Sequence, residues 1–176
     1  MLGTRVAWAG WSILLGLTVL RLLVCIGVPL TPDEAYYRVW ALAPAAGYLD
    51  HPPMVAAFIG LGQVIAGDTA LGMRLMGPLA AALGSVLLFC AAREWAQLRG
   101  VSAQAAQYAG LKAAVLLNGT LALGVGSVLM TPDTPLLFFV ALLLWAFVRL
   151  VGSQRGLWWL VLGAVAGLGV DSKYAT

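Results

Sequence analysis

Carboxylate side chains occur in two short segments of this sequence, here called corners, that share the tripeptide Thr-Pro-Asp. The first is Thr31–Glu34, with Asp33 and Glu34 side by side, and the second is Thr131–Asp133. Carboxylates in such positions can act as general bases or orient a nucleophile, so Asp33, Glu34 and Asp133 are candidate catalytic residues. Thr, Pro and Glu at this spacing also form a helix-capping box, and the local pattern leaves both interpretations open.

A third polar corner lies between the two. Asp50 and the only histidine, His51, precede Pro52 and Pro53, and two prolines in a row stiffen the chain there. Tyr37 follows the first corner closely. We therefore predict that Asp50, His51 and Tyr37 contact a substrate.

Three cations stand near the same corners. Arg21 lies within a long apolar run, Arg74 near the start of another, and Lys173 after the last one. Arg21 can extend its charge toward the membrane surface, yet charges inside a membrane usually face a protein interior or a wet cavity. We predict that Arg74, Lys173 and the deeper Arg21 bind an anionic substrate.

The composition sets the environment of these residues. Hydrophobic residues make up 62% of the chain and charged residues 10%, whereas a soluble domain carries about 25% charge. The chain is therefore predicted to be an integral membrane protein. Its basic residues are scattered singly, which argues against nucleic acid as a partner. The two cysteines, Cys25 and Cys90, form no disulfide framework or metal-ligand spacing.

The apolar runs predict an all-α, polytopic transmembrane bundle. A spanning helix needs about 20 apolar residues. An outer loop, residues 31–70, carries a shorter apolar segment, 54–66, whose length suits an interfacial or re-entrant helix. The first run is too long for a signal-peptide core, so we expect an uncleaved helix. The five predicted spans are residues 6–30, 71–92, 103–130, 135–151 and 157–170.

Charge sets the expected orientation, because short cytoplasmic loops are rich in Lys and Arg. With the N-terminus in the cytoplasm, five arginines fall inside: Arg5, Arg93, Arg99, Arg149 and Arg155. Arg38, Arg74 and Lys173 then fall outside. Six of the seven acids also fall outside, which places the candidate site at the extracytoplasmic face.

The stretches LTPDEAYYRVWALAPAAGYLDHPPM, MTPDTPLLFFVALLLWAF and GLGVDSKYAT together resemble GT-C membrane glycosyltransferases. The nearest group is glycosyltransferase family 39, the protein mannosyltransferase-like and aminoarabinose transferase-like enzymes. The resemblance runs from about Arg21 to Lys173. Its known members are much longer, so the chain is expected to be the N-terminal portion of such an enzyme, and this portion alone is expected to lack activity.

The resemblance implies hexosyl or pentosyl transfer from a polyprenyl-phosphate donor to a lipid, glycan or protein acceptor, at the outer face of a bacterial inner membrane. It implies Asp33 as the catalytic carboxylate, with Glu34 and Asp133 as further acids. Arg74 and Lys173 occupy positions where relatives hold the lipid phosphate, and His51 stands where relatives carry Lys or His.

A direct displacement with inversion would then need a base, Asp33, and cations that neutralise the leaving phosphate. No cofactor is established by the residues, and a divalent cation is left open. Two alternatives stay open as well. The chain could be a non-catalytic, transporter-like membrane protein that binds lipid or a cation through its outer acids, or an inactive truncated remnant.

Overall fold

The computed structural model describes residues 2–174, and the side chains of residues 7–174, so that the predicted inner cation Arg5 lies outside the described side chains. Within this range every regular element is a helix. The helices are α1 (Leu2–Gly27), α2 (Pro32–Leu42), α3 (Met54–Ala66), α4 (Ala70–Arg74), α5 (Met76–Leu98), α6 (Ala103–Asn118), α7 (Leu121–Gly124), α8 (Asp133–Ser153) and α9 (Leu157–Val170).

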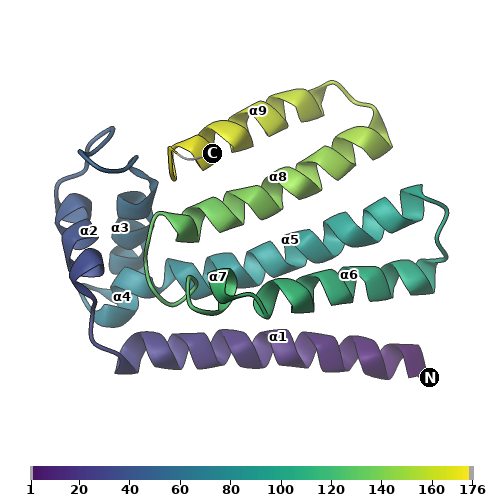
Figure 1. Ribbon diagram of the computed structural model, residues 1–176, viewed down its shortest axis with the longest axis horizontal. Coiled ribbons are helices and arrows are strands. Elements are labelled where there is room, and N and C mark those ends of the chain that lie inside the picture. The colour runs from purple at the N-terminus through teal and green to yellow at the C-terminus, as the bar shows by residue number, and fades with distance from the viewer. Residues whose placement is uncertain (1, 175–176) are drawn as a thin grey trace.

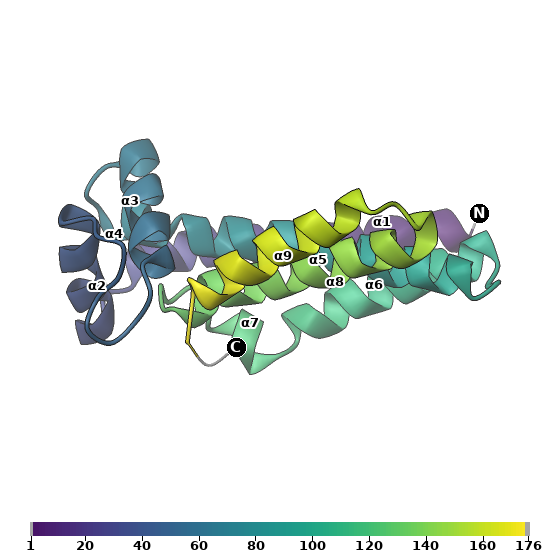
Figure 2. The same ribbon diagram turned by 90° about the horizontal axis from the view of Figure 1, so that it is seen from above.

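The long helices lie side by side in a flat bundle, and the short ones gather at one end (Figure 1). Helix α5 packs against both α6 and α8, α9 packs on α8, and α1 runs along α5 and α6. Helices α2, α3 and α4 cap the end of the bundle where α1 finishes and α5 begins, and the view from above shows the same separation (Figure 2). The predicted all-α membrane bundle is therefore confirmed.

Three helical segments are long and apolar enough to cross a membrane: Ala7–Gly27, Ala70–Leu98 and Asp133–Ser153. Helices α3 and α9 are shorter apolar helices. Large apolar side chains lie on the outside of the bundle, among them Leu15, Leu116 and Leu160, which are 66%, 71% and 72% exposed. Such a surface is stable against lipid tails and not against water.

One predicted span is wrong. Residues 103–130 do not form one helix, because α6 ends at Asn118 and only the single turn α7 follows before α8. Asn118-Gly119 is a poor helix sequence, and the Thr120 side chain accepts a hydrogen bond from the Leu123 amide, which starts a new turn. Irregular backbone at membrane depth requires protein partners. The absence of a side chain at Gly77 lets α5 pack closely against this segment, because a Cβ at this position would lie 2.5 Å from the Ser127 carbonyl oxygen.

Helix boundaries also differ from the predicted ones. Helix α1 ends at Gly27 and not at Leu30, because Pro29 cannot continue the hydrogen-bond ladder. The second Thr-Pro-Asp corner is not capped as the first one is. The Thr134 hydroxyl, and not that of Thr131, organises it by accepting from the Thr131 amide at 3.2 Å and bonding the Gly126 carbonyl at 2.8 Å.

The acids gather at one end of the bundle, as the charge pattern predicts. We call this the acidic end; it is made by residues 28–75, 119–133 and 171–174, and it holds Asp33, Glu34, Asp50, Asp68, Asp133 and Asp171. The opposite end, where α5 meets α6 and α8 meets α9, holds Glu94 with Arg93, Arg99, Arg149 and Arg155.

Candidate functional site

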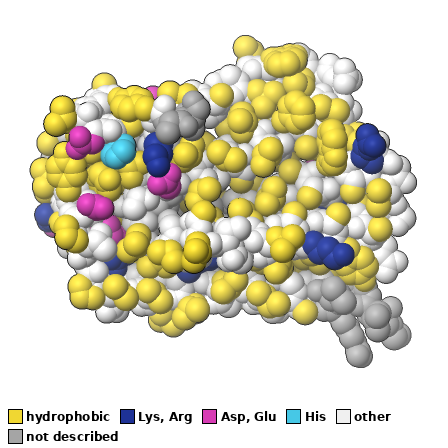
Figure 3. Space-filling model, viewed as in Figure 1, with side chains coloured by type: hydrophobic (Ala, Val, Ile, Leu, Met, Phe, Trp, Pro, Cys, Tyr) yellow, Lys and Arg dark blue, Asp and Glu magenta, His cyan; other side chains and the backbone are white. Residues whose placement is uncertain are grey.

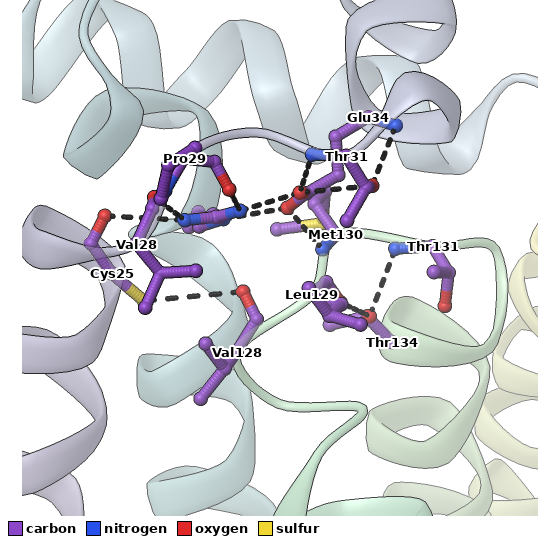
Figure 4. A network of polar contacts seen from close by, with 11 residues as sticks. Cys25, Val28, Pro29, Thr31, Glu34, Val128, Leu129, Met130, Thr131 and Thr134 are labelled. Atoms are coloured by element: carbon purple, nitrogen blue, oxygen red, sulfur yellow. Dashed lines mark hydrogen bonds and ion pairs between the residues drawn. The ribbon is translucent and has the colours of Figure 1, made fainter.

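A fully buried ion pair lies inside the acidic end (Figure 4). Arg74 Nε and Nη2 each donate to one oxygen of Glu34, both at 2.6 Å. The remaining donors of Arg74 reach the carbonyl oxygens of Val28 at 2.7 Å and Pro29 at 3.0 Å, where α1 has ended. This two-pronged geometry is the strongest form of a carboxylate–guanidinium contact. It fixes α2 and α4 to the end of α1.

The same carboxylate joins the two Thr-Pro-Asp corners. Glu34 Oε2 accepts from the Thr31 amide at 2.9 Å, which completes the predicted capping box, and Oε1 accepts from the Met130 amide at 3.1 Å. Burial opposes ionisation of Glu34, but Arg74 and the amides of Thr31 and Met130 outweigh it, so the pKa of Glu34 lies below its ordinary value. Glu34 is therefore an ionised structural anchor.

This geometry does not support the predicted catalytic role of Glu34 or the predicted binding of an anionic substrate by Arg74. Both side chains are 0% exposed, and both carboxylate oxygens of Glu34 already accept hydrogen bonds from the protein. Neither group presents an edge to a ligand. The exposed surface here is formed by neighbouring residues, among them Asp33.

Asp33 is exposed next to the buried Glu34, because consecutive residues at a helix start point in different directions. The negative charge of Asp33 influences the phenol of the nearly buried Tyr37, and so do the charges of Asp50 and Asp133. The pKa of Tyr37 is raised first by burial and then by the negative charges of these three acids. Of the sequence-predicted residues, Asp33, Asp50 and Asp133 thus share an electrostatic influence on Tyr37.

Asp133 forms an ion pair with Lys173. Lys173 Nζ lies 2.8 Å and 3.1 Å from the two carboxylate oxygens of Asp133. The Asp133 side chain is 51% exposed and that of Lys173 is 33% exposed, so the pair lies at the surface of the acidic end. This ion pair therefore holds the start of α8 to the residues after α9.

The loop between α2 and α3 closes over this region. Tyr36 donates its hydroxyl to Asp50 Oδ2 at 2.8 Å, which raises the pKa of Tyr36. The His51 ring packs edge-on to Tyr37, with ring centroids 6.1 Å apart. At the end of the loop the Met54 amide donates to the Asp171 carbonyl at 3.1 Å. His51 and Asp50 therefore lie at the same acidic end as Asp33 and Lys173.

The space-filling view shows this gathering directly (Figure 3). Acidic side chains, a basic one and the histidine group together over the end formed by α2 and α3, while the rest of that face is mainly apolar. An exposed carboxylate, a half-exposed ammonium group and an imidazole on one face can accept a proton and neutralise an anion.

Arg21 lies apart from this group. It is 5% exposed, and its Nη1 donates to Asn118 Oδ1 at 2.7 Å, while Nη2 lies 3.4 Å from the Leu123 carbonyl oxygen. It borders an apolar cavity of about 370 Å³ between α1 and residues 124–129. Arg21 thus supports the broken end of α6, and its predicted contact with substrate stays a prediction.

The sequence did not single out several polar residues that organise the acidic end and the bundle next to it. Asn118 also donates to the Ser85 hydroxyl at 2.7 Å, and Arg38 donates through Nε to Asp68 at 2.8 Å. An asparagine inside an apolar run was the one available signal, because such a group needs buried partners. Across residues 2–174, no three His, Cys, Asp or Glu side chains lie close enough to share a metal ion.

Known proteins resemble this chain in sequence. Residues 50–176 match the family described as dolichyl-phosphate-mannose-protein mannosyltransferase. Lipid A galacturonosyltransferase RgtD of Rhizobium johnstonii is 30% identical over 171 residues, which cover 95% of this chain and 34% of that protein. The chain thus spans about a third of the length of this relative. No solved structure matches. The chain belongs to the dolichyl-phosphate-mannose-protein mannosyltransferase family, within the GT-C membrane glycosyltransferases.

Proposed function

We propose that this chain forms the catalytic acidic end of a membrane glycosyltransferase that takes its sugar from a polyprenyl phosphate. The observation that carries the proposal is the contrast between two adjacent acids. Glu34 is locked into a buried ion pair, whereas Asp33 is exposed at the same acidic end as His51 and the Asp133–Lys173 pair. Family membership supplies the reaction class, and this face supplies the groups that the reaction needs.

In the proposed reaction an acceptor hydroxyl attacks the anomeric carbon of the sugar while the bond from that carbon to the phosphate oxygen breaks. The phosphate leaves with the electron pair, and the hydroxyl proton passes to Asp33. Attack from the side opposite the phosphate inverts the anomeric centre. Lys173, held by Asp133, neutralises the charge that develops on the phosphate. Holding the acceptor in line contributes as much as basicity does.

The acceptor is proposed to be a hydroxyl of a saccharide-bearing lipid. The name of the relative specifies lipid A as what that protein acts on, whereas the family description specifies a protein. The acidic end is proposed to face the extracytoplasmic side of a bacterial inner membrane, where such lipids carry their sugars. The predicted positive-inside orientation supports this placement.

The test compares Asp33→Asn with Asp171→Asn in the full-length protein, with transfer of a labelled sugar from its polyprenyl phosphate as the measurement. Asp171 is an exposed acid at the same end whose backbone, and not its carboxylate, contacts Met54. We expect Asp33→Asn to lower transfer by about 10²–10⁴-fold and Asp171→Asn to leave it unchanged. Full transfer by Asp33→Asn would remove this residue from the mechanism.

A further inference from the structure

A polar cavity lies at the end of the bundle opposite the acidic end. It has a volume of about 430 Å³ and lies between the last turns of α5 and α8. Its polar lining includes Arg93, Glu94 and Gln97 from α5 and Arg149 from α8. Gln97 is exposed, so the cavity is accessible from outside the bundle.

The two arginines of this cavity are held by aromatic rings and have donors to spare. The Arg93 guanidinium lies 5.6 Å from the centre of the Phe89 ring, and the Arg149 guanidinium lies 5.6 Å from that of Trp158. Among the described residues, the buried Nε of Arg93 has no hydrogen-bond partner. Arg149 reaches Glu94 only at 3.4 Å, which is long for a charged hydrogen bond. The cavity therefore contains two guanidinium groups, those of Arg93 and Arg149, and one carboxylate, that of Glu94, whose hydrogen bond to Arg149 is long.

The tryptophans of the chain indicate how deep this cavity lies in the membrane. Tryptophan side chains concentrate at the level of lipid headgroups. Of the seven tryptophans in the chain, all except Trp40 lie toward this end, on α1, α5, α8 and α9. They are Trp8, Trp11, Trp95, Trp145, Trp158 and Trp159. The cavity therefore opens where phosphodiester groups of a leaflet are most concentrated.

We propose that this cavity binds the phosphate of a phospholipid headgroup. The N–H edges of Arg93 and Arg149 donate to the phosphate oxygens, and the guanidinium planes remain stacked on Phe89 and Trp158. Arginine suits this role because its planar fork matches phosphate and also stacks on aromatic rings. Glu94 then accepts from an ammonium or hydroxyl group of the headgroup.

The test uses the 176-residue chain in detergent, with native mass spectrometry as the measurement. Three probes are added separately: dioleoylphosphatidylglycerol, dioleoylglycerol without a phosphate, and inorganic phosphate. We expect adducts with the phospholipid alone. Arg93→Gln and Arg149→Gln should each weaken its binding about tenfold, the effect of losing one charge-assisted hydrogen bond. Arg155→Gln is the matched control, because Arg155 is exposed at the same end and outside the cavity lining.

An equal loss in Arg155→Gln would overturn the proposal, since it would show attraction by net charge. Binding of inorganic phosphate but not of the lipid would overturn the membrane lipid as occupant, and binding of dioleoylglycerol would overturn the role of the phosphate. A photoreactive headgroup keeps the proposal testable if the variants fail to fold. Crosslinks in the unaltered chain should map to residues 93–98 and 148–153, and crosslinks confined to other segments would refute it.

Discussion

Glu34 and Arg74 stand forty residues apart in sequence and form an ion pair with two contacts of 2.6 Å and no exposure to solvent. The pair joins the start of α2, the end of α4 and the chain leaving α1, and Glu34 adds the Met130 amide. This anchor determines where its exposed neighbour Asp33 lies. Glu34 therefore stabilises the structure of the acidic end, whereas the adjacent Asp33 is available for catalysis.

The first prediction concerns Glu34→Gln. The substitution leaves the Arg74 guanidinium charged and buried without its counter-ion, so we expect the chain to lose about 3–5 kcal/mol of unfolding free energy. Denaturant titration in detergent micelles, followed by circular dichroism, measures this loss. Asp68→Asn is the control, because the Arg38–Asp68 pair is exposed and its loss should shift the transition little. Equal shifts in both variants would contradict the anchoring role.

The second prediction is a pH dependence of stability. The pKa of Glu34 is lowered from 4.5 in the folded chain, so its contribution is complete above the unfolded value and is lost as the pH falls through the folded one. We expect the thermal midpoint to decline below about pH 4.5 more steeply in the unaltered chain than in Glu34→Gln. Parallel curves for the two proteins from pH 7 to pH 3 would show that Glu34 does not titrate with unfolding.

Local patterns predicted the local structure well. The capping box at Thr31 forms in both directions, because its partners are only three residues apart and no distant group competes for them. Helix α9 has the predicted bounds, Leu157–Val170, since Gly156 and Asp171 flank a continuous apolar run. The gathering of acids at one end followed from the alternation of spans. Each of these features depends on neighbouring residues or on the count of crossings.

Long-range partners were not predictable in the same way. The positions of Arg74 and Lys173 predicted that both bind phosphate. In the structure Arg74 forms a buried ion pair with Glu34, whereas Lys173 forms a half-exposed ion pair with Asp133. The break after Asn118 was missed because hydropathy alone continues to Met130. Asn118-Gly119 and the Thr120 cap start the break locally, and Asn118 is held there by a contact with Arg21, 97 residues away, which no local window contains.

The third prediction tests this break. Asn118→Leu restores an apolar helix sequence, but it leaves the Arg21 guanidinium buried without its nearest acceptor. We expect a loss of about 2–4 kcal/mol in unfolding free energy, measured by denaturant titration in micelles. The double variant Arg21→Met/Asn118→Leu should recover much of it, since both polar partners are then gone. A double variant as unstable as the single one would show that Asn118 acts independently of Arg21.

The fourth prediction separates catalysis from stability at the surface pair. In the intact protein, Lys173→Met should lower kcat/KM for the polyprenyl-phosphate donor by about 10²-fold, because the leaving phosphate loses a cation. Unfolding free energy should change by no more than about 1 kcal/mol, as for other partly exposed pairs. Lys173→Arg should retain part of the activity. Lys112→Met, an exposed lysine of α6, is the control and should transfer sugar normally. Equal activity of Lys173→Met and Lys112→Met would remove Lys173 from the site.

The fifth prediction fixes the orientation of the bundle. Leu49 is 93% exposed in the loop before α3, and Val101 is 42% exposed between α5 and α6, at the opposite end. The arginines beside Val101 favour the cytoplasm for that end. In bacterial cells we therefore expect a membrane-impermeant maleimide to label Leu49→Cys from outside, and to label Val101→Cys only after the membrane is opened. The unaltered chain, whose Cys25 is buried, gives the background. Labelling of Val101→Cys in intact cells, with Leu49→Cys protected, would invert the bundle and place the acidic end in the cytoplasm.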